Sequence, residues 1–169
     1  MEKTFKVIND LEKEGVIEKY ALGGATALLF YAEPQNTWDV DVFVFLPGMG
    51  DIIDLTPLAQ TLKKKGYMWE KAQEVMIEGV PVHFLVPPLG LVEEGVKEAA
   101  IHMYRDVQVK VIRIEHLLAI MLETNLPRHR ERIAGLLEKK VKFDEEKLQA
   151  ILTKHHLKEK WERAIEKPK

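Results

Sequence analysis

Two carboxylates separated by one residue are the chemically most suggestive feature of this sequence. Asp39 and Asp41 flank Val40 and lead into the apolar residues 42–45. A strand over this segment would place both carboxylates on one face, with Cα atoms about 6.5–7 Å apart. Like charges at that distance repel each other unless a cation lies between them, and carboxylate oxygens are the ligands that Mg²⁺ prefers. We therefore predict that Asp39 and Asp41 bind a divalent metal ion.

A glycine pair, Gly23-Gly24, precedes these carboxylates and is followed by an apolar stretch at 25–32. Glycines allow the backbone to approach a phosphate closely, and a helix beginning there would direct its free N–H groups at an anion. Thr26 would add a hydroxyl donor. A phosphate-binding turn beside a two-carboxylate metal site is what nucleotidyl transfer requires. Each feature alone is common in structural turns and solvated strands, so the prediction depends on their combination in this order.

The spacing of apolar residues indicates which elements would position these segments. It predicts a helix over 2–18, a short strand at 20–22 and a helix over 25–32 that Pro34 ends. The carboxylates would lie at the start of a strand over 39–45, where polar and apolar residues alternate. The glycine turn and the carboxylate strand are therefore expected to be neighbours in a sheet.

The rest of the chain divides into a mixed part and a helical part. The mixed part continues with a helix at 54–65, strands at 67–69, 75–77 and 82–86, a helix at 91–103 and a strand at 107–112. The helical part has predicted helices at 114–123, 127–139, 144–152 and 155–165. This order indicates an α+β fold, with a small mixed sheet flanked by helices over 1–113 and a C-terminal helical subdomain over 114–169.

Composition excludes several classes of protein. The 169 residues are 46% hydrophobic and 31% charged, which is typical of a globular domain and excludes intrinsic disorder. The absence of cysteine excludes a disulfide scaffold, a thiolate zinc site and a cysteine nucleophile. No apolar run reaches the ~20 residues that span a bilayer, and no leader segment begins the chain, so a cytoplasmic protein without membrane contact is expected.

The charges are unevenly distributed. Residues 1–126 contain 12 Lys/Arg and 19 Asp/Glu, whereas residues 127–169 contain 13 Lys/Arg and 8 Asp/Glu. An acidic body followed by a basic tail suggests an anionic partner. The alternative is an ordinary solvated helix surface.

The glycine turn and the carboxylate strand together resemble the minimal nucleotidyltransferase superfamily. The resemblance depends on Leu22–Ala25 and on Thr37–Val42, which match a Gly-Gly turn followed by an Asp-x-Asp strand that a threonine precedes. The AbiEii-like branch, named for an abortive-infection toxin, is the most similar. Its helical region is similar to residues 115–122 and 128–132 and to Leu136-Leu137, so the resemblance extends over about 15–163.

The resemblance implies a nucleotidyltransferase palm over 1–113. Asp39 and Asp41 would hold Mg²⁺ on the triphosphate of a nucleoside triphosphate, and Gly23 and Gly24 would hold its phosphates. On the helical side, Arg128 and Arg130 would face the triphosphate or the acceptor. The implied reaction is metal-dependent transfer of a nucleoside monophosphate to a hydroxyl of RNA or protein, in a toxin-like role with an antitoxin as partner. The alternative is a catalytically impaired module that binds nucleotide as a regulatory ligand.

His83 is where this sequence departs from the family. The family places a third catalytic acid on a later strand, and Val82–Leu85 is the best match to that strand, with His83 at the acid position. Three interpretations stay open. His83 is a hydrogen-bonded structural residue, or it replaces the acid as a base or as a ligand to Mn²⁺, or it marks a site that binds nucleotide without transfer.

Four other residues complete the set of candidates. Glu74 and Glu78 would flank a hairpin and face solvent, but either of them, or Asp106, would act as the third carboxylate if it approached Asp39 and Asp41 in space. Trp38 should face away from the carboxylates on the strand. Packing is its expected role, and stacking on a nucleotide base is the alternative.

Overall fold

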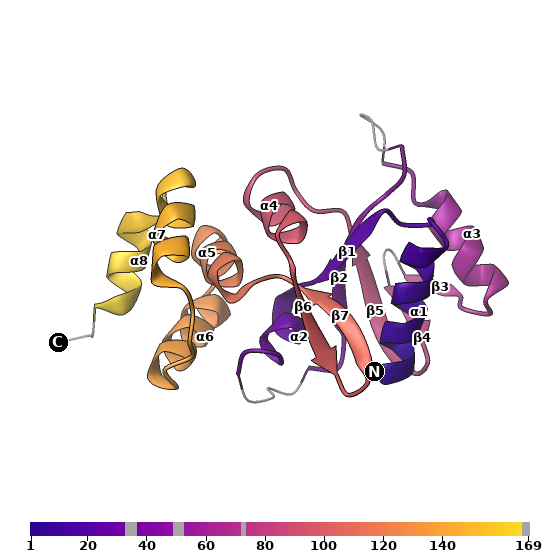
Figure 1. The fold of residues 1–169 in the computed structure, drawn as a ribbon, viewed down its shortest axis with the longest axis horizontal. Coiled ribbons are helices and arrows are strands. Elements are labelled where there is room, and N and C mark those ends of the chain that lie inside the picture. Colours follow the sequence, from indigo (N-terminus) through magenta and orange to yellow (C-terminus); the bar gives the residue numbers. More distant parts are fainter. Residues whose placement is uncertain (33–36, 49–52, 72–73, 167–169) are drawn as a thin grey trace.

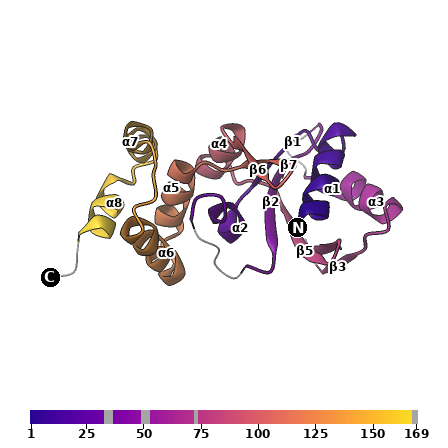
Figure 2. The same cartoon turned by 60° about the horizontal axis from the view of Figure 1, so that its bottom comes forward.

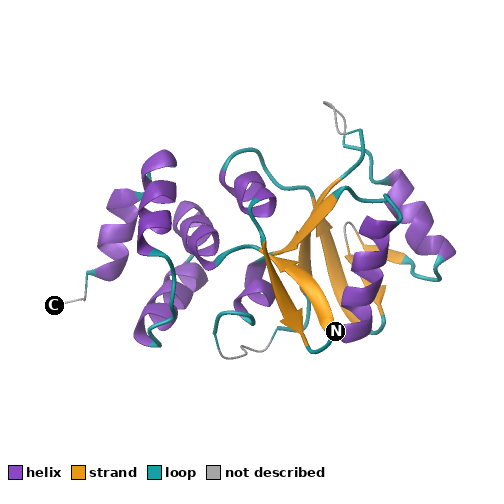
Figure 3. Cartoon of the chain, viewed as in Figure 1, coloured by secondary structure: helices purple, strands orange, loops and turns teal. Residues whose placement is uncertain are grey.

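The computed structural model describes residues 1–32, 37–48, 53–71 and 74–166 (Figure 1). Pro34, the predicted end of the second helix, lies outside the described residues. Helices and strands are interspersed up to residue 111, and the described elements after it are all helical, which confirms the α+β class (Figure 3). The strands are β1 (Lys19–Leu22), β2 (Val40–Phe45), β3 (Trp69–Lys71), β4 (Glu74–Ile77), β5 (Val80–Leu85), β6 (Ala100–Tyr104) and β7 (Val107–Val111). The helices are α1 (Glu2–Lys13), α2 (Gly24–Leu28), α3 (Thr56–Lys64), α4 (Leu91–Lys97), α5 (Ile114–Thr124), α6 (Pro127–Glu138), α7 (Glu145–Lys154) and α8 (Lys158–Ile165).

The seven described strands form one mixed sheet in the order β3-β4-β5-β2-β1-β7-β6. β2 is central and pairs antiparallel with β1 and parallel with β5, and β5 continues into an antiparallel hairpin with β4. Val40, Val42 and Val44 alternate with half-buried residues along β2 and are fully buried. The predicted alternation of the carboxylate strand is therefore confirmed from Val40 onward.

Helices cover the two faces of the sheet unequally. α1 and α3 lie together on one face (Figure 2). Thr4 of α1 donates a hydrogen bond to the carbonyl oxygen of Ile77. α2 lies on the other face (Figure 2), and it is short, because its helical turns end at Leu28 rather than continuing to residue 32. On this second face the side chains of β2 and β5 are half-buried, so they are open to a ligand.

β6 is a strand in a segment for which the sequence predicts a helix. The predicted helix over 91–103 ends at Lys97, and Ala100–Tyr104 forms a hairpin with β7. His102 and Tyr104 pack inward on Phe30, whereas Ile101 and Met103 face outward, 65% and 55% exposed. The period-two alternation of this segment is the signal that favours a strand, and helix propensity obscured it.

The C-terminal helices pack around α5. Of its side chains, Leu118, Ala119 and even the polar His116 are fully buried. α7 and α8 lie at the end of the molecule opposite α3 (Figure 1). Because α5 also packs on α4 of the sheet layer, the division at residue 113 stays a prediction. Among the described residues, no helix has the length and apolar character needed to cross a membrane.

Glu94 joins α4 to the C-terminal helices. Its carboxylate accepts hydrogen bonds from His116 Nε2 at 3.3 Å and from His155 Nε2 at 3.2 Å, and it pairs with Lys154. Burial alone would raise the pKa of Glu94, but the hydrogen bonds from Lys154, His155 and His116 outweigh burial and lower it to about 2. Burial lowers the pKa of His116, so at neutral pH its Nε2 donates as the neutral imidazole.

We expect Glu94→Gln to lower the free energy of unfolding at pH 7 by about 1–3 kcal/mol, because charge-assisted hydrogen bonds are lost. A depressed pKa stabilises the fold above the unfolded-state value of 4.5, and this contribution disappears as the pH falls through about 2. Urea unfolding of both proteins between pH 7 and pH 2 should therefore show a difference that shrinks below pH 4.5. Glu159→Gln, which removes an exposed pairing with Arg163, is the control. A difference independent of pH would contradict this role of Glu94.

Candidate functional site

Three polar side chains form a row across adjacent strands on the open face of the sheet. Asp41 of β2 is in register with His83 of β5, and His83 is in register with Glu74 of β4. Residues in register on neighbouring strands point to the same face. The side chains of all three are between 27% and 29% exposed. The sheet register therefore brings together residues that lie up to 42 positions apart in the sequence.

His83 contacts carboxylates on both sides of its ring. Its Nε2 lies 2.9 Å from Glu74 Oε2, and its Nδ1 lies 3.3 Å from Asp41 Oδ1 and 3.7 Å from Asp39 Oδ2. The hydrogen bond with Glu74 raises the pKa of His83 most; burial acts in the opposite direction, and Asp41 and Asp39 raise the pKa further. The surrounding carboxylates therefore favour the imidazolium form of His83.

Asp39 lies immediately before β2 and is oriented by two threonines. Thr37 Oγ1 is 3.0 Å from Asp39 Oδ1, and Thr26 Oγ1 donates to the Asp39 carbonyl oxygen at 2.8 Å. Thr26 is 1% exposed. The expected donation from the Thr26 hydroxyl to a phosphate is therefore replaced by a hydrogen bond that fixes the backbone of Asp39.

Gly23 and Gly24 each occupy a position where a larger residue would clash, but with different neighbours. A Cβ on Gly23 would lie 2.4 Å from the ring of Phe43, so this glycine allows the turn to pack on β2. Gly24 has a φ of +55°, and a Cβ on it would lie 2.1 Å from Asp41 Oδ2. The backbone of the glycine turn thus lies directly against one of the two carboxylates.

The donor atoms fit a divalent cation. One ligand atom each from Asp39, Asp41 and His83 lie within 4.8 Å of one another. Ligand atoms around a metal with bonds of about 2.1 Å are separated by roughly 3 Å when they are neighbours, and the 3.3 Å and 3.7 Å separations are close to that value. Two carboxylate oxygens and one imidazole nitrogen could therefore hold a metal with little movement.

The structure corrects the expectation for Glu74. Glu74 was expected to be solvated, yet it is half-buried and bonded to His83, which lies between it and Asp41. Glu78 accepts a hydrogen bond from the Tyr67 hydroxyl at 2.7 Å instead. Of the three carboxylates proposed as a third acid, Glu74 approaches the site, and it does so through the imidazole. In the sequence, the only indication was a glutamate at the start of the β4 segment. The register of the β4–β5 hairpin is what identifies His83 as its partner.

The arginines and the tryptophan complete the predicted set. Arg128 and Arg130 are exposed on α6, and in the described residues no hydrogen bond or ion pair joins either of them to Asp39 or Asp41. Arg130 instead lines a cavity of about 610 Å³ with Lys160, Arg163 and Leu122 of α5. Trp38, expected to pack, is 82% exposed beside Asp39. Packing is therefore wrong for Trp38, and its indole is accessible to a ligand.

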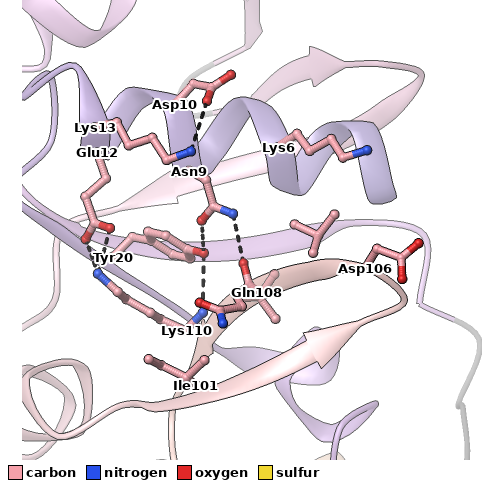
Figure 4. Close-up of a pocket in the computed structure, with 12 residues that line it drawn as sticks. Lys6, Asn9, Asp10, Glu12, Lys13, Tyr20, Ile101, Asp106, Gln108 and Lys110 are labelled. Atoms are coloured by element: carbon pink, nitrogen blue, oxygen red, sulfur yellow. Dashed lines mark hydrogen bonds and ion pairs between the residues drawn. The ribbon is translucent and has the colours of Figure 1, made fainter.

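A separate cavity of about 370 Å³ lies between α1 and the β6–β7 hairpin (Figure 4). Asp106 lines it, far in the sheet order from the row on β2, β5 and β4. Its polar groups satisfy one another: Lys110 pairs with Glu12 at 2.6 Å, and Tyr20 donates to Asn9 at 2.6 Å. This network attaches α1 to β7.

Known proteins similar to this chain were sought among protein families, curated proteins and solved structures. No protein-family model matches the chain, and no curated protein matches it either. Among solved structures, the chain is similar to the solution structure of the antibiotic-resistance factor ANT(2'')-Ia, with a TM-score of 0.46 and 13% identity over 94% of this chain and 85% of that chain. A likeness this distant says nothing about substrate or metal.

Proposed function

We propose that this protein is a metal-dependent nucleotidyltransferase, which transfers a nucleoside monophosphate from a nucleoside triphosphate to a hydroxyl group. The observation that carries the proposal is the contact between the glycine turn and the carboxylate pair. Gly24 lies against Asp41, while Asp39 and His83 complete a cation site on the same open face. A phosphate beside that turn would share its oxygens with a cation on the two carboxylates.

Each group has a distinct task in this reaction. The turn at Gly23 and Gly24, packed against Asp41, would lie beside the phosphates, and Asp39 and Asp41 would hold the cation. A bound Mg²⁺ or Mn²⁺ would neutralise charge on the triphosphate and on the departing pyrophosphate. A bond forms between the acceptor oxygen and the α-phosphorus, the bond to the bridging α–β oxygen breaks so that pyrophosphate leaves, and the proton of the acceptor hydroxyl passes to solvent. Thr37 and Thr26 keep Asp39 in place throughout.

The acceptor and the cellular role follow only from the resemblance to the AbiEii-like branch. On that basis the acceptor is RNA or a protein hydroxyl, the setting is the cytoplasm, and a partner antitoxin restrains the activity. The exposed Arg128 and Arg130 on α6 belong to the basic segment 127–169 and would contact an anionic acceptor.

Incubation with each labelled nucleoside triphosphate tests the proposed function. The mixture contains cellular RNA and protein with either Mg²⁺ or Mn²⁺, and RNA and protein are then separated. We expect label from one or more nucleotides in one of the two fractions, and none with the Asp39→Asn/Asp41→Asn protein. Nucleotide binding without any transfer would instead identify the regulatory module that lacks the third acid.

The exposed Trp38 leads to a further expected result. Trp38→Ala should weaken nucleotide binding about 5- to 150-fold, because stacking of a base on an aromatic ring contributes about 1–3 kcal/mol. Trp38→Phe should retain most of the affinity. Titration of each protein with a nucleoside triphosphate in an equilibrium binding assay gives the comparison.

The fluorescence of Trp38 provides the control for this prediction. Trp161 is buried, and Trp69 packs near Phe84, so quenching by nucleotide should originate from Trp38 and disappear in Trp38→Phe. Equal nucleotide affinity of Trp38→Ala and the unaltered protein would exclude stacking on this residue.

A further inference from the structure

His83 is hydrogen-bonded to Glu74, a carboxylate that is not itself one of the three ligands of the cation site. Glu74 Oε2 lies 2.9 Å from His83 Nε2, the ring nitrogen that faces away from Asp41. The opposite nitrogen, Nδ1, faces Asp41 Oδ1 at 3.3 Å and Asp39 Oδ2 at 3.7 Å. The imidazole therefore has one edge on Glu74 and the other edge on the two aspartates.

A carboxylate on one ring nitrogen determines what the other nitrogen can do. The hydrogen bond keeps a proton on Nε2, fixes the rotation of the ring and increases the basicity of Nδ1. With a cation between the aspartates, the neutral ring presents the Nδ1 lone pair to it. A carboxylate, a histidine and a metal in sequence are the common arrangement by which a second carboxylate orients a histidine ligand.

The sheet makes this arrangement rigid. Glu74 and His83 are directly paired across the β4–β5 hairpin, and His83 and Asp41 are directly paired between β5 and β2. Val75 and Val82, the neighbours of Glu74 and His83, are buried on the opposite face and prevent the strands from turning over. Backbone pairing therefore brings the three side chains together, and their contact does not depend on the ordering of a surface loop.

We propose that Glu74 is a positioning residue that holds His83 as a nitrogen ligand beside Asp39 and Asp41, so that the site binds Mn²⁺ more tightly than Mg²⁺. This inference rests on the cation site of the proposed function and deepens it. Mg²⁺ requires oxygen ligands in near-octahedral geometry, whereas imidazole suits first-row transition ions. A histidine at this position therefore gives the site a nitrogen ligand that favours Mn²⁺.

Metal binding by the full chain without nucleotide tests the proposal. After chelator treatment, Mn²⁺ is titrated while the electron paramagnetic resonance signal of free Mn²⁺ is followed, and Mg²⁺ is titrated in competition. We expect Mn²⁺ to bind at least about 10-fold more tightly than Mg²⁺. Electron spin-echo modulation of the bound Mn²⁺ should show coupling to one ¹⁴N nucleus, which identifies a directly bound imidazole.

Three variants separate ligand from positioning residue. His83→Asp should lose the ¹⁴N coupling and most of the preference for Mn²⁺. Glu74→Ala should weaken Mn²⁺ binding about 10- to 100-fold, the usual effect of losing an outer-shell partner. Glu74→Gln should recover part of the affinity, because its amide oxygen still accepts from Nε2–H. Glu78→Ala, which alters the other hairpin glutamate and its bond to Tyr67, should bind Mn²⁺ like the unaltered protein.

The outcomes either support or overturn the proposal. Bound Mn²⁺ without ¹⁴N coupling, equal affinity for Mg²⁺ and Mn²⁺, or unchanged binding in Glu74→Ala would overturn it. If Glu74→Ala fails to fold by circular dichroism, Glu74→Gln with its intact volume decides the question through its Mn²⁺ affinity. No transfer is measured here. A protein that binds Mn²⁺ as expected but transfers no nucleotide would therefore contradict the proposed function and leave the Glu74–His83 assignment intact.

Discussion

Replacing both Asp39 and Asp41 by asparagine is expected to reduce nucleotidyl transfer at least about 10³-fold. A catalytic cation supplies several kcal/mol of transition-state stabilisation, and each 1.4 kcal/mol corresponds to a tenfold change in rate. Asparagine keeps the volume of each side chain and removes its charge, so Thr37 and Gly24 retain their contacts. The initial rate of label transfer, normalised to the folded fraction, measures this loss.

The same variant should lose the thermal stabilisation by ligand. Metal and nucleotide at about 100 times their dissociation constants stabilise a protein by about 2.7 kcal/mol, a shift of roughly 5–10 °C for a chain of this size. Asp106→Asn, in the distant β6–β7 turn, is the matched control and should retain the full shift. A metal-dependent shift of equal size in the Asp39→Asn/Asp41→Asn protein would eliminate these carboxylates as the cation site.

Gly24→Ala should both destabilise the protein and weaken the cation site. The φ of +55° costs an alanine about 1–2 kcal/mol. The new Cβ would lie 2.1 Å from Asp41 Oδ2, so the carboxylate or the turn must move, at a further cost of about 1–3 kcal/mol. We expect a melting temperature lower by roughly 5–15 °C. Mn²⁺ affinity should also fall, because Asp41 is displaced from His83.

Gly15→Ala separates the two causes. Gly15 has a φ of +71°, but nothing lies within 4 Å of its added Cβ, so this variant bears only the backbone cost. It should be destabilised less and should bind Mn²⁺ normally. If Gly24→Ala has the same melting temperature and the same Mn²⁺ affinity as Gly15→Ala, the close approach of the glycine turn to Asp41 does not contribute to stability or to metal binding.

The parts of the site that could be predicted from the sequence are those with a local pattern. Val40 to Phe45 alternate, so the strand and the inward direction of its valines follow from side-chain period alone. The glycine pair needed no partner to be recognised as a turn, since Gly24 adopts a conformation that few other residues tolerate. The helices after residue 113 were predictable for the same reason, because their apolar spacing is local.

Pairing between distant strands has no such local pattern. Glu74 was expected in solvent and Trp38 in a packed position, and both expectations were wrong. The register of β4 with β5 places Glu74 against His83. The path of the chain into β2 leaves Trp38 exposed. The Thr26 hydroxyl likewise bonds to Asp39 because α2 packs on β2. The prediction of a helix over 91–103 was wrong for Ala100–Tyr104, because this segment pairs with β7 as a strand.

The sequence by itself therefore determined that two carboxylates on one strand follow a glycine turn, since side-chain period and glycine conformation are properties of short segments. Only the tertiary structure decided what stands beside them. His83 lies between Asp41 and Glu74 because three strands pair in one register. That register depends on burying Val42, Val75 and Val82 on the opposite face together with α1 and α3, a gain in free energy that no single segment contains.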